Sequence, residues 1–338
     1  MNIAARLRAR PGKLALLGCG AMGTTIARSV QHLNGWSVSA AFDAKPEAVE
    51  RFRRAFPSVS VAADIEVFWD AARMADVLAI ATTADNHMSG TLQALESGVR
   101  TILLEKPAAT SLADADDLIE AAQRAGARIA IDHTRRWLAS GDGLRRLIGD
   151  GVLGNPRAIH FYYGRAGFAM IGTHLFDLAR WLTGSEITRL RAELDPEPGV
   201  NKRGRQFVDP PGYCEARFAN GVRLTVDLSS DLRLRQRAFV VICENGRLEV
   251  DERLGRVRLA GTGGRAWEAE YISPDVLELG VASALHELQG GVPPRATLAD
   301  GRAALEAAIA CQVSAREGGR WVEMPLVGDI RKERFPFA

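Results

Sequence analysis

The glycine-rich segment Gly18-Cys19-Gly20-Ala21-Met22-Gly23 constrains the fold of this chain more than any other feature of the sequence. It follows an apolar run at residues 13–17, which predicts a strand, and opens an amphipathic stretch at 22–32, which predicts a helix. A Gly-x-Gly-x-x-Gly turn between a strand and a helix is typical of a dinucleotide-binding Rossmann unit. Gly18 permits the tight turn, Gly20 lets the backbone approach a pyrophosphate, and Gly23 lets the helix pack on the sheet. The residues expected to bind the dinucleotide here are Gly18, Gly20, Ala21, Met22 and Gly23.

Asp43 ends the second predicted strand, at residues 38–42, and lies twenty positions after Gly23. A carboxylate at this point accepts hydrogen bonds from the hydroxyls of the adenosine ribose, which favours NAD over NADP. Lys45 lies close enough in the sequence to neutralise a 2′-phosphate. The sequence therefore predicts NAD as the cofactor, with NADP as the alternative.

The first 131 residues alternate short apolar runs with amphipathic stretches, which is the pattern of a parallel sheet with crossover helices. Further strands are expected at 59–61, 76–81, 101–104 and 128–131. Further helices are expected at 46–55, at 87–97, and from the N-cap Ser111 to Ala125. We predict that residues 1–134 form a dinucleotide-binding Rossmann domain with a doubly wound parallel sheet.

The pattern changes after about residue 134. Helices are expected at 142–149 and 172–183, a strand at 158–163, and mostly strand from 189 to 271. Asn220-Gly221 and Asn245-Gly246 separate alternating runs, which is the strongest short-range signal for a hairpin. Helices at 275–289 and 298–315 follow. We predict that residues 135–338 form a second α/β domain with a largely antiparallel sheet.

The amino-acid composition argues against several classes of binding partner. The formal net charge is only +2, from 43 basic and 41 acidic side chains, whereas nucleic-acid binding needs a concentrated positive face. The four cysteines are far apart, which indicates reduced thiols in a cytoplasmic protein rather than a disulfide framework or a zinc site. No apolar run approaches membrane-spanning length, and no histidine–carboxylate cluster has metal-ligand spacing. We expect a cytoplasmic protein with a small-molecule partner and no metal, nucleic acid or membrane partner.

Several further motifs occur in a characteristic order. They are Ala-Thr-Thr-Ala-Asp-Asn-His at 81–87, Glu-Lys-Pro at 105–107, Gly-Thr-His-Leu-Phe-Asp at 172–177, Trp-Leu-Thr-Gly at 181–184 and Asp-Gly-Arg-Ala-Ala-Leu at 300–305. With the glycine turn, they make nearly the whole chain resemble the Gfo/Idh/MocA family, the glucose-fructose oxidoreductase and inositol dehydrogenase superfamily. The resemblance implies that residues 135–338 are a substrate-binding and oligomerisation domain with an open sheet, in a homodimer or homotetramer. It also implies hydride transfer between NAD(P) and a secondary alcohol or ketone of a sugar, sugar derivative or cyclitol.

Lys106 follows the strand predicted at 101–104, at the sheet edge where open α/β sheets bind ligands. Its ammonium can hydrogen-bond the reacting oxygen and stabilise the charge of a developing alkoxide. The alternative is a surface lysine at a strand end. The resemblance implies that Glu105 and Lys106 border the cofactor, that the bond before Pro107 is cis, and that Thr82, Thr83 and His87 line the nicotinamide pocket.

His174 lies in the first turn of the helix predicted at 172–183. The resemblance assigns the catalytic acid/base to this position, and imidazole exchanges protons near neutral pH. A structural histidine is the alternative. Asp177 lies three residues further on and either orients the imidazole, binds substrate or caps the helix.

Met170 departs from the family pattern, because many relatives carry an acidic residue four positions before this histidine. A thioether takes up no proton. Either Lys106 and His174 suffice, or a neighbour such as Tyr163 substitutes, or the catalysis has changed. The expected substrate-binding residues are Arg136, Tyr163 and Asp177, with a structural salt bridge as the alternative for Arg136 and core packing as the alternative for Tyr163.

Two other functions stay open at this point. One is an NAD-dependent enzyme that oxidises a sugar transiently, cleaves or eliminates a group, and then returns the hydride. The other is a non-catalytic dinucleotide-binding protein.

Overall fold

The computed structural model describes residues 10–151, 153–196, 201, 203–230, 237–261, 266–270 and 277–338. Contacts between Cα atoms divide the chain into two compact units. The first consists of Met1–Ala109, Ala113–Trp137 and Val276–Arg302, and the second of Thr110–Leu112, Leu138–Asp275 and Ala303–Ala338. The C-terminal part of the chain is thus shared between the two units, with the change at Arg302 and Ala303. The domain boundary that we expect after residue 134 stays a prediction.

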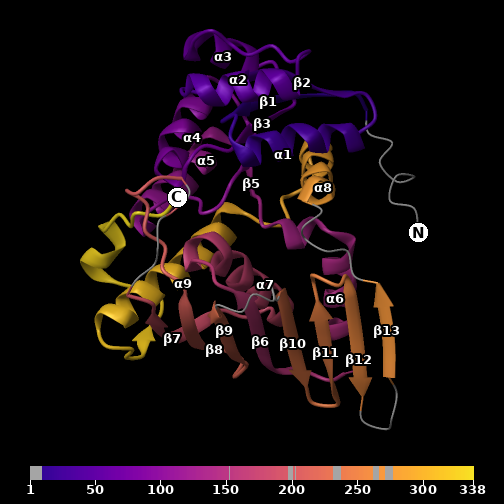
Figure 1. The fold of residues 1–338 in the computed structure, drawn as a ribbon, viewed down its shortest axis with the longest axis vertical. Helices are drawn as coiled ribbons and strands as arrows, with labels where there is room; N and C mark the ends of the chain where they lie inside the picture. The colour runs from indigo at the N-terminus through magenta and orange to yellow at the C-terminus, as the bar shows by residue number, and fades with distance from the viewer. Residues whose placement is uncertain are drawn as a thin grey trace. The chain divides into compact units, whose positions relative to one another are not determined.

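The first unit is built on a five-stranded sheet in the order β2-β1-β3-β4-β5 (Figure 1). Its strands are β1 (Gly12–Leu17), β2 (Trp36–Phe42), β3 (Val77–Ile80), β4 (Thr101–Leu104) and β5 (Arg128–Ile131). Every neighbouring pair is parallel. The strand order reverses between β1 and β3, and ligands of open α/β sheets bind at the carboxyl ends of strands beside such a reversal. The predicted Rossmann sheet is confirmed.

Helices accompany this sheet. They are α1 (Ala21–Ser29), α2 (Pro46–Ala55), α3 (Ile65–Ala72), α4 (His87–Glu96), α5 (Leu112–Ala125) and α8 (Leu277–Gln289), with 3-10 turns η2 (Val30–His32), η3 (Ala84–Asn86) and η4 (Thr134–Trp137). Helix α8 comes from late in the chain, yet it packs on α1 and on β3, β4 and β5 (Figure 1). The first two residues of the helix predicted at 275–289 lie outside the described residues.

Two predictions for this unit are wrong in detail. The strand expected at 59–61 is reduced to one bridge between Ala41 and Val61. Helix α3 is absent from the prediction, because eight residues are too few to show a clear helical period. Its start has a visible signal, since the Asp64 carboxylate accepts a hydrogen bond from the Val67 N–H at 2.9 Å.

The second unit contains a nine-stranded sheet in the order β13-β12-β11-β10-β6-β9-β8-β7-β14. Its strands are β6 (Pro156–Gly164), β7 (Ile187–Leu194), β8 (Gly212–Phe218), β9 (Arg223–Ser230), β10 (Arg237–Cys243), β11 (Gly246–Asp251), β12 (Arg256–Gly261), β13 (Ala266–Glu270) and β14 (Val322–Glu323). Among these nine described strands, only β6 and β9 pair in parallel. The largely antiparallel fold is confirmed, as are the hairpins at Asn220-Gly221 and Asn245-Gly246, which join β8 to β9 and β10 to β11.

The helices of the second unit are α6 (Ala139–Gly149), α7 (Thr173–Thr183) and, from Ala303 onward, α9 (Leu298–Arg316), with the 3-10 turn η6 (Gly328–Lys332). Helix α7 packs on β6 and on α6 (Figure 1). One turn of π-helix, η5 (Phe168–Gly172), leads into it, and the rings of Phe168 and Phe176 stack with centroids 6.0 Å apart. Gly184 ends α7 in the left-handed conformation at φ 59°. The first turn of α7, which carries His174, is therefore anchored in the core.

Candidate active site

The glycine turn has the geometry that a dinucleotide needs. Gly18 has φ 104° and donates its N–H to Phe42 O at 2.8 Å, and a Cβ there would lie 2.6 Å from Ala81 backbone. A Cβ on Gly23 would lie 1.9 Å from Gly18 O, so only glycine lets α1 begin this close to the turn. A Cβ on Gly20 would meet nothing within 4 Å, so its backbone borders open space. The first amides of α1 lack partners within the helix and carry the positive end of its dipole. The residues present therefore fit a pyrophosphate.

Asp43 ties the end of β2 to this turn. One carboxylate oxygen accepts the Cys19 N–H at 2.8 Å, and the other accepts the Lys45 N–H at 2.8 Å. Each oxygen keeps a second lone pair, so the carboxylate can still accept ribose hydroxyls. Burial and the Asp43 charge raise the pKa of Cys19 to about 12, which keeps this thiol protonated beside the turn.

His87 joins the ends of two strands. It is 1% exposed, and its ring nitrogens lie 2.7 Å from Pro107 O and 3.2 Å from Thr82 O. Thr82 and Thr83 follow β3 and are half-buried, and Lys106 follows β4. The His87 ring therefore bridges the backbone of the turn after β3 and the backbone of the turn after β4. Its expected contact with the cofactor stays a prediction. The Lys106–Pro107 peptide bond is cis, as the resemblance implies.

Lys106 is half-buried beside two carboxyl groups. Glu105 is 5% exposed, and Asp132, which directly follows β5, is 1% exposed. Burial raises the pKa of Asp132, while hydrogen bonds with Glu105 and Thr134 and the Lys106 charge oppose that rise. The prediction did not include Asp132. Its position after an apolar strand, one strand along from Glu105, is the signal that could have found it.

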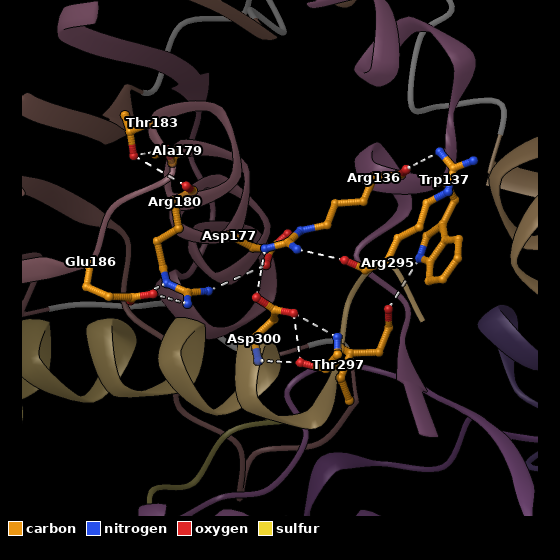
Figure 2. Close-up of polar contacts among 11 residues, drawn as sticks. Arg136, Trp137, Asp177, Ala179, Arg180, Thr183, Glu186, Arg295, Thr297 and Asp300 are labelled. Atoms are coloured by element: carbon orange, nitrogen blue, oxygen red, sulfur yellow. Dashed lines mark hydrogen bonds and ion pairs between the residues drawn. The ribbon is translucent and has the colours of Figure 1, made fainter. Parts of the chain in front are cut away.

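Arg136 is 5% exposed and takes part in a network within the first unit (Figure 2). It donates to Arg295 O at 2.7 Å and to the Asp300 carboxylate at 3.1 Å. Asp300 also accepts the N–H and hydroxyl of Thr297 at 2.9 and 2.8 Å. Trp137 is 2% exposed, with its indole N–H 3.4 Å from Ile131 O. This arrangement supports the structural alternative for Arg136, and its role in substrate binding stays a prediction.

The second unit carries the other predicted residues. His174 is half-buried on the first turn of α7, and Met170 is 41% exposed one turn earlier. Asp177 is 1% exposed and lies 4.0 Å from the Arg180 guanidinium, which holds Glu186 with two hydrogen bonds of 2.7 and 2.6 Å (Figure 2). His174 and Asp177 lie three residues apart on the same helix, α7.

Tyr163 is 4% exposed, and its hydroxyl donates to Glu252 at 2.5 Å. Glu252 itself is fully buried. The pair supports the packing alternative for Tyr163, and its expected role toward substrate stays a prediction.

Asp209 is a residue that sequence reasoning missed. Its two carboxylate oxygens accept the N–H groups of Ala169 and Met170 at 2.9 and 2.8 Å. A Cβ on Gly167 would lie 2.0 Å from this carboxylate, so glycine admits it to the turn. An acidic side chain thus reaches the backbone at position 170 from a distant loop, and no short motif marks such an approach.

Within the described ranges, no three His, Cys, Asp or Glu side chains are grouped so that they could hold a metal ion. No helix in the part of the chain that the structure describes is long and apolar enough to cross a membrane.

The motifs and both units have counterparts in known proteins. Residues 13–133 match an oxidoreductase family with an NAD-binding Rossmann fold, and residues 143–249 match the GFO/IDH/MocA C-terminal domain. An inositol 2-dehydrogenase of Streptomyces avermitilis is 30% identical over 71% of this chain and 72% of its own length. A D-apiose dehydrogenase of Paraburkholderia graminis is 29% identical over 53% of this chain and 52% of its own length, so the match spans about half of that protein. The chain belongs to the Gfo/Idh/MocA family of oxidoreductases, and its N-terminal part is the family's NAD-binding Rossmann domain.

Solved structures agree on the fold. A levoglucosan dehydrogenase in complex with NADH and levoglucosan superposes with a TM-score of 0.81 at 19% identity, covering 94% of this chain and 100% of that chain. An inositol dehydrogenase homologue from Azotobacter vinelandii, complexed with NADH and myo-inositol, gives 0.77 at 19% identity over 96% and 100% of the two chains.

Proposed function

We propose that this oxidoreductase transfers a hydride between NAD and a secondary alcohol or ketone of a sugar, sugar derivative or cyclitol. The observation that carries the proposal is Lys106, which follows β4 at the sheet edge where β1 ends in the glycine turn. The names of relatives, inositol 2-dehydrogenase and D-apiose dehydrogenase, support this substrate class.

The amides of Ala21 and Met22 and the Asp43 carboxylate would hold the dinucleotide by its pyrophosphate and ribose. When bound, the nicotinamide supplies the hydride acceptor for oxidation or the hydride donor for reduction. Lys106 donates a hydrogen bond to the reacting oxygen and stabilises its negative charge. In oxidation His174 takes the hydroxyl proton, and in reduction it returns that proton to the oxygen. Met170 takes no part in this proton transfer.

A direct test uses Lys106→Ala, with the exposed Lys13→Ala as the matched control. Dehydrogenase activity is screened with myo-inositol, D-apiose and levoglucosan, and dinucleotide affinity is measured by fluorescence titration. We expect Lys106→Ala to lower kcat/KM by about a thousandfold on the best substrate, with dinucleotide affinity roughly unchanged. Near-normal turnover by Lys106→Ala would overturn the role of this residue. Dinucleotide binding without turnover of any polyol would favour a non-catalytic protein.

Transient oxidation is the second candidate, because Met170 occupies the position where many relatives have an acid. It predicts dinucleotide that copurifies with the protein, and product that forms without net change in nicotinamide absorbance. Sustained stoichiometric NADH formation would exclude it.

We further propose a homodimer or homotetramer assembled through the open face of the second sheet. Tyr162 on β6 and Ile242 on the neighbouring β10 are 44% and 38% exposed. Sedimentation velocity should show a dimer or tetramer that Tyr162→Asp weakens, whereas a monomer at all concentrations would contradict this assembly.

A further inference from the structure

Two buried carboxyl groups lie at the ends of adjacent strands in the first unit. Leu104 and Ile131 are paired at the ends of β4 and β5, and Glu105 and Asp132 follow them. The Asp132 N–H donates to Leu104 O at 2.9 Å, and the Glu105 N–H donates to Ile80 O at 3.0 Å. The strand ladder therefore fixes the backbone of both residues. With exposures of 5% and 1%, neither carboxyl is solvated as a surface carboxylate would be.

Glu105 and Asp132 stand at neighbouring strand ends, and a hydrogen bond with the Glu105 side chain is among the influences that lower the pKa of Asp132. One Asp132 oxygen, Oδ1, accepts the Thr134 hydroxyl at 3.1 Å. An ionised carboxylate is only an acceptor, so a bond between two carboxyl groups requires one of them to carry a proton. Two like charges in one buried site also disfavour double ionisation. One proton and one negative charge are thus the chemically consistent state of the pair.

Lys106 supplies the opposing charge. It follows Glu105 in the chain, and its ammonium is close enough to Asp132 to lower the pKa of that carboxyl. The other ionisable residues of the turn after β5 are His133, Arg135 and Arg136, which are 2%, 6% and 5% exposed, and Arg136 pairs with Asp300 at 3.1 Å. The local arrangement is therefore one ammonium beside a carboxyl pair with a single negative charge.

We propose that Glu105 and Asp132 form a proton-sharing carboxyl pair whose single negative charge holds Lys106 in its ammonium form. Glu105 and Asp132 are then positioning residues that act through Lys106 and do not touch the reacting oxygen. Their part in turnover rests on the function proposed above, whereas the existence of the pair and its effect on Lys106 do not.

The first test measures the titration of Lys106 without any substrate. The chain has only five lysines, so reductive methylation with ¹³C gives few dimethylamine signals, and Lys106→Arg assigns the relevant one. Asp132→Asn or Glu105→Gln alone leaves one carboxylate, so each single variant removes the shared proton and keeps the negative charge. The double variant Glu105→Gln/Asp132→Asn removes the charge, and we expect it to move the Lys106 titration down by about one pH unit, while the single variants leave it near its wild-type value. Asp116→Asn, whose carboxylate pairs with Arg302 at 2.9 Å, is the control and should leave it in place. An unchanged Lys106 titration in the double variant would overturn the proposal.

The second test looks for the shared proton itself. Infrared spectroscopy of the unliganded protein at neutral pH should show the carbonyl band of a protonated carboxyl group. Asp132→Asn and Glu105→Gln should each remove this band, and Asp116→Asn should keep it. A wild-type spectrum without a protonated carboxyl band would contradict the pair even if both variants fold poorly.

The third test connects the pair to turnover. In the pH profile of kcat/KM, the alkaline limb at which Lys106 loses its proton should move down by about one pH unit in the double variant Glu105→Gln/Asp132→Asn. A purely structural role would lower activity at every pH without moving that limb. If no polyol is turned over, the proposed function fails while the spectroscopic tests still decide the pair. If the pair is absent but Lys106→Ala behaves as expected, the proposed function stands alone.

Discussion

The lack of a Cβ atom in its glycines explains much of the geometry of the dinucleotide turn. Gly18, Gly20 and Gly23 belong to one motif, yet the structure gives them different tasks. Gly18 and Gly23 avoid contacts of 2.6 and 1.9 Å with backbone atoms, whereas Gly20 borders open space. Folding therefore depends on the outer two glycines, and ligand approach depends on the middle one.

This difference gives a prediction at the residue scale. Gly23→Ala should lower the free energy of unfolding by about 3 kcal/mol, because its Cβ collides with a backbone oxygen that cannot rotate away. Gly20→Ala should fold normally and lose at least about tenfold in NAD affinity, because the added methyl group occupies the approach to the backbone. Urea unfolding and fluorescence titration measure the two effects. Equal destabilisation by both substitutions would refute the division of roles.

Motif residues were predictable one by one, and residues positioned by tertiary structure were not. The glycines and Asp43 lie at fixed spacing after strands, so local sequence identifies them. Asp132 and Asp209 take their meaning from neighbours that are distant in the sequence, namely Glu105 and the turn at Ala169 and Met170. The spacing of residues along the chain does not predict such tertiary contacts.

At the scale of elements, Asp209 fixes the entry to α7. Its carboxylate accepts the N–H groups of Ala169 and Met170, one turn before His174. Asp209→Ala should cost about 1 kcal/mol of stability through loss of this cap, and amide exchange at 169 and 170 should quicken first. Asp209→Asn keeps one acceptor oxygen and should give a smaller effect. Unchanged exchange at both amides in Asp209→Ala would show that the cap is dispensable.

The first turn of α9 is held by the ion pair of Arg136 and Asp300, whose side chains are 6% and 20% exposed. Breaking such a pair leaves a charge poorly solvated, so Arg136→Ala and Asp300→Ala should each lower the free energy of unfolding by about 3 kcal/mol. If Arg136 is structural, KM for the best polyol should stay similar in both variants. A large rise in KM in Arg136→Ala alone would restore the substrate-binding role.

Long, regular elements were predictable, and short or capped ones were less so. The parallel strands and the two Asn-Gly hairpins follow from apolar runs and turn chemistry that operate locally. The short helix α3 and the bridge at Val61 depend on the neighbouring strand β2 for their final form. Helix α8 was expected as a helix, but its packing on the first sheet is a tertiary fact that periodicity does not contain.

At the scale of the whole molecule, the raised pKa of Asp132 makes global stability depend on pH. An unfolded aspartate loses its proton near pH 3.8, whereas the folded chain keeps this proton to higher pH. Between these two values the folded state binds more protons, so the free energy of unfolding falls as pH rises, by up to about 1.4 kcal/mol per pH unit. Asp132→Asn removes this component. In urea unfolding from acidic to neutral pH, the change in stability of the variant should be more positive than that of the wild-type protein, and parallel curves would contradict the pKa shift.

Hydride transfer is the central claim, and deuterium reports it most directly. The best polyol, deuterated at the carbon that bears the reacting hydroxyl, is incubated with the enzyme and NAD, and mass spectrometry follows both products. We predict that one deuterium appears in NADH for each ketone formed, and that Lys106→Ala slows this transfer by about a thousandfold. Product that forms without deuterated NADH, or that regains the deuterium itself, would contradict the account.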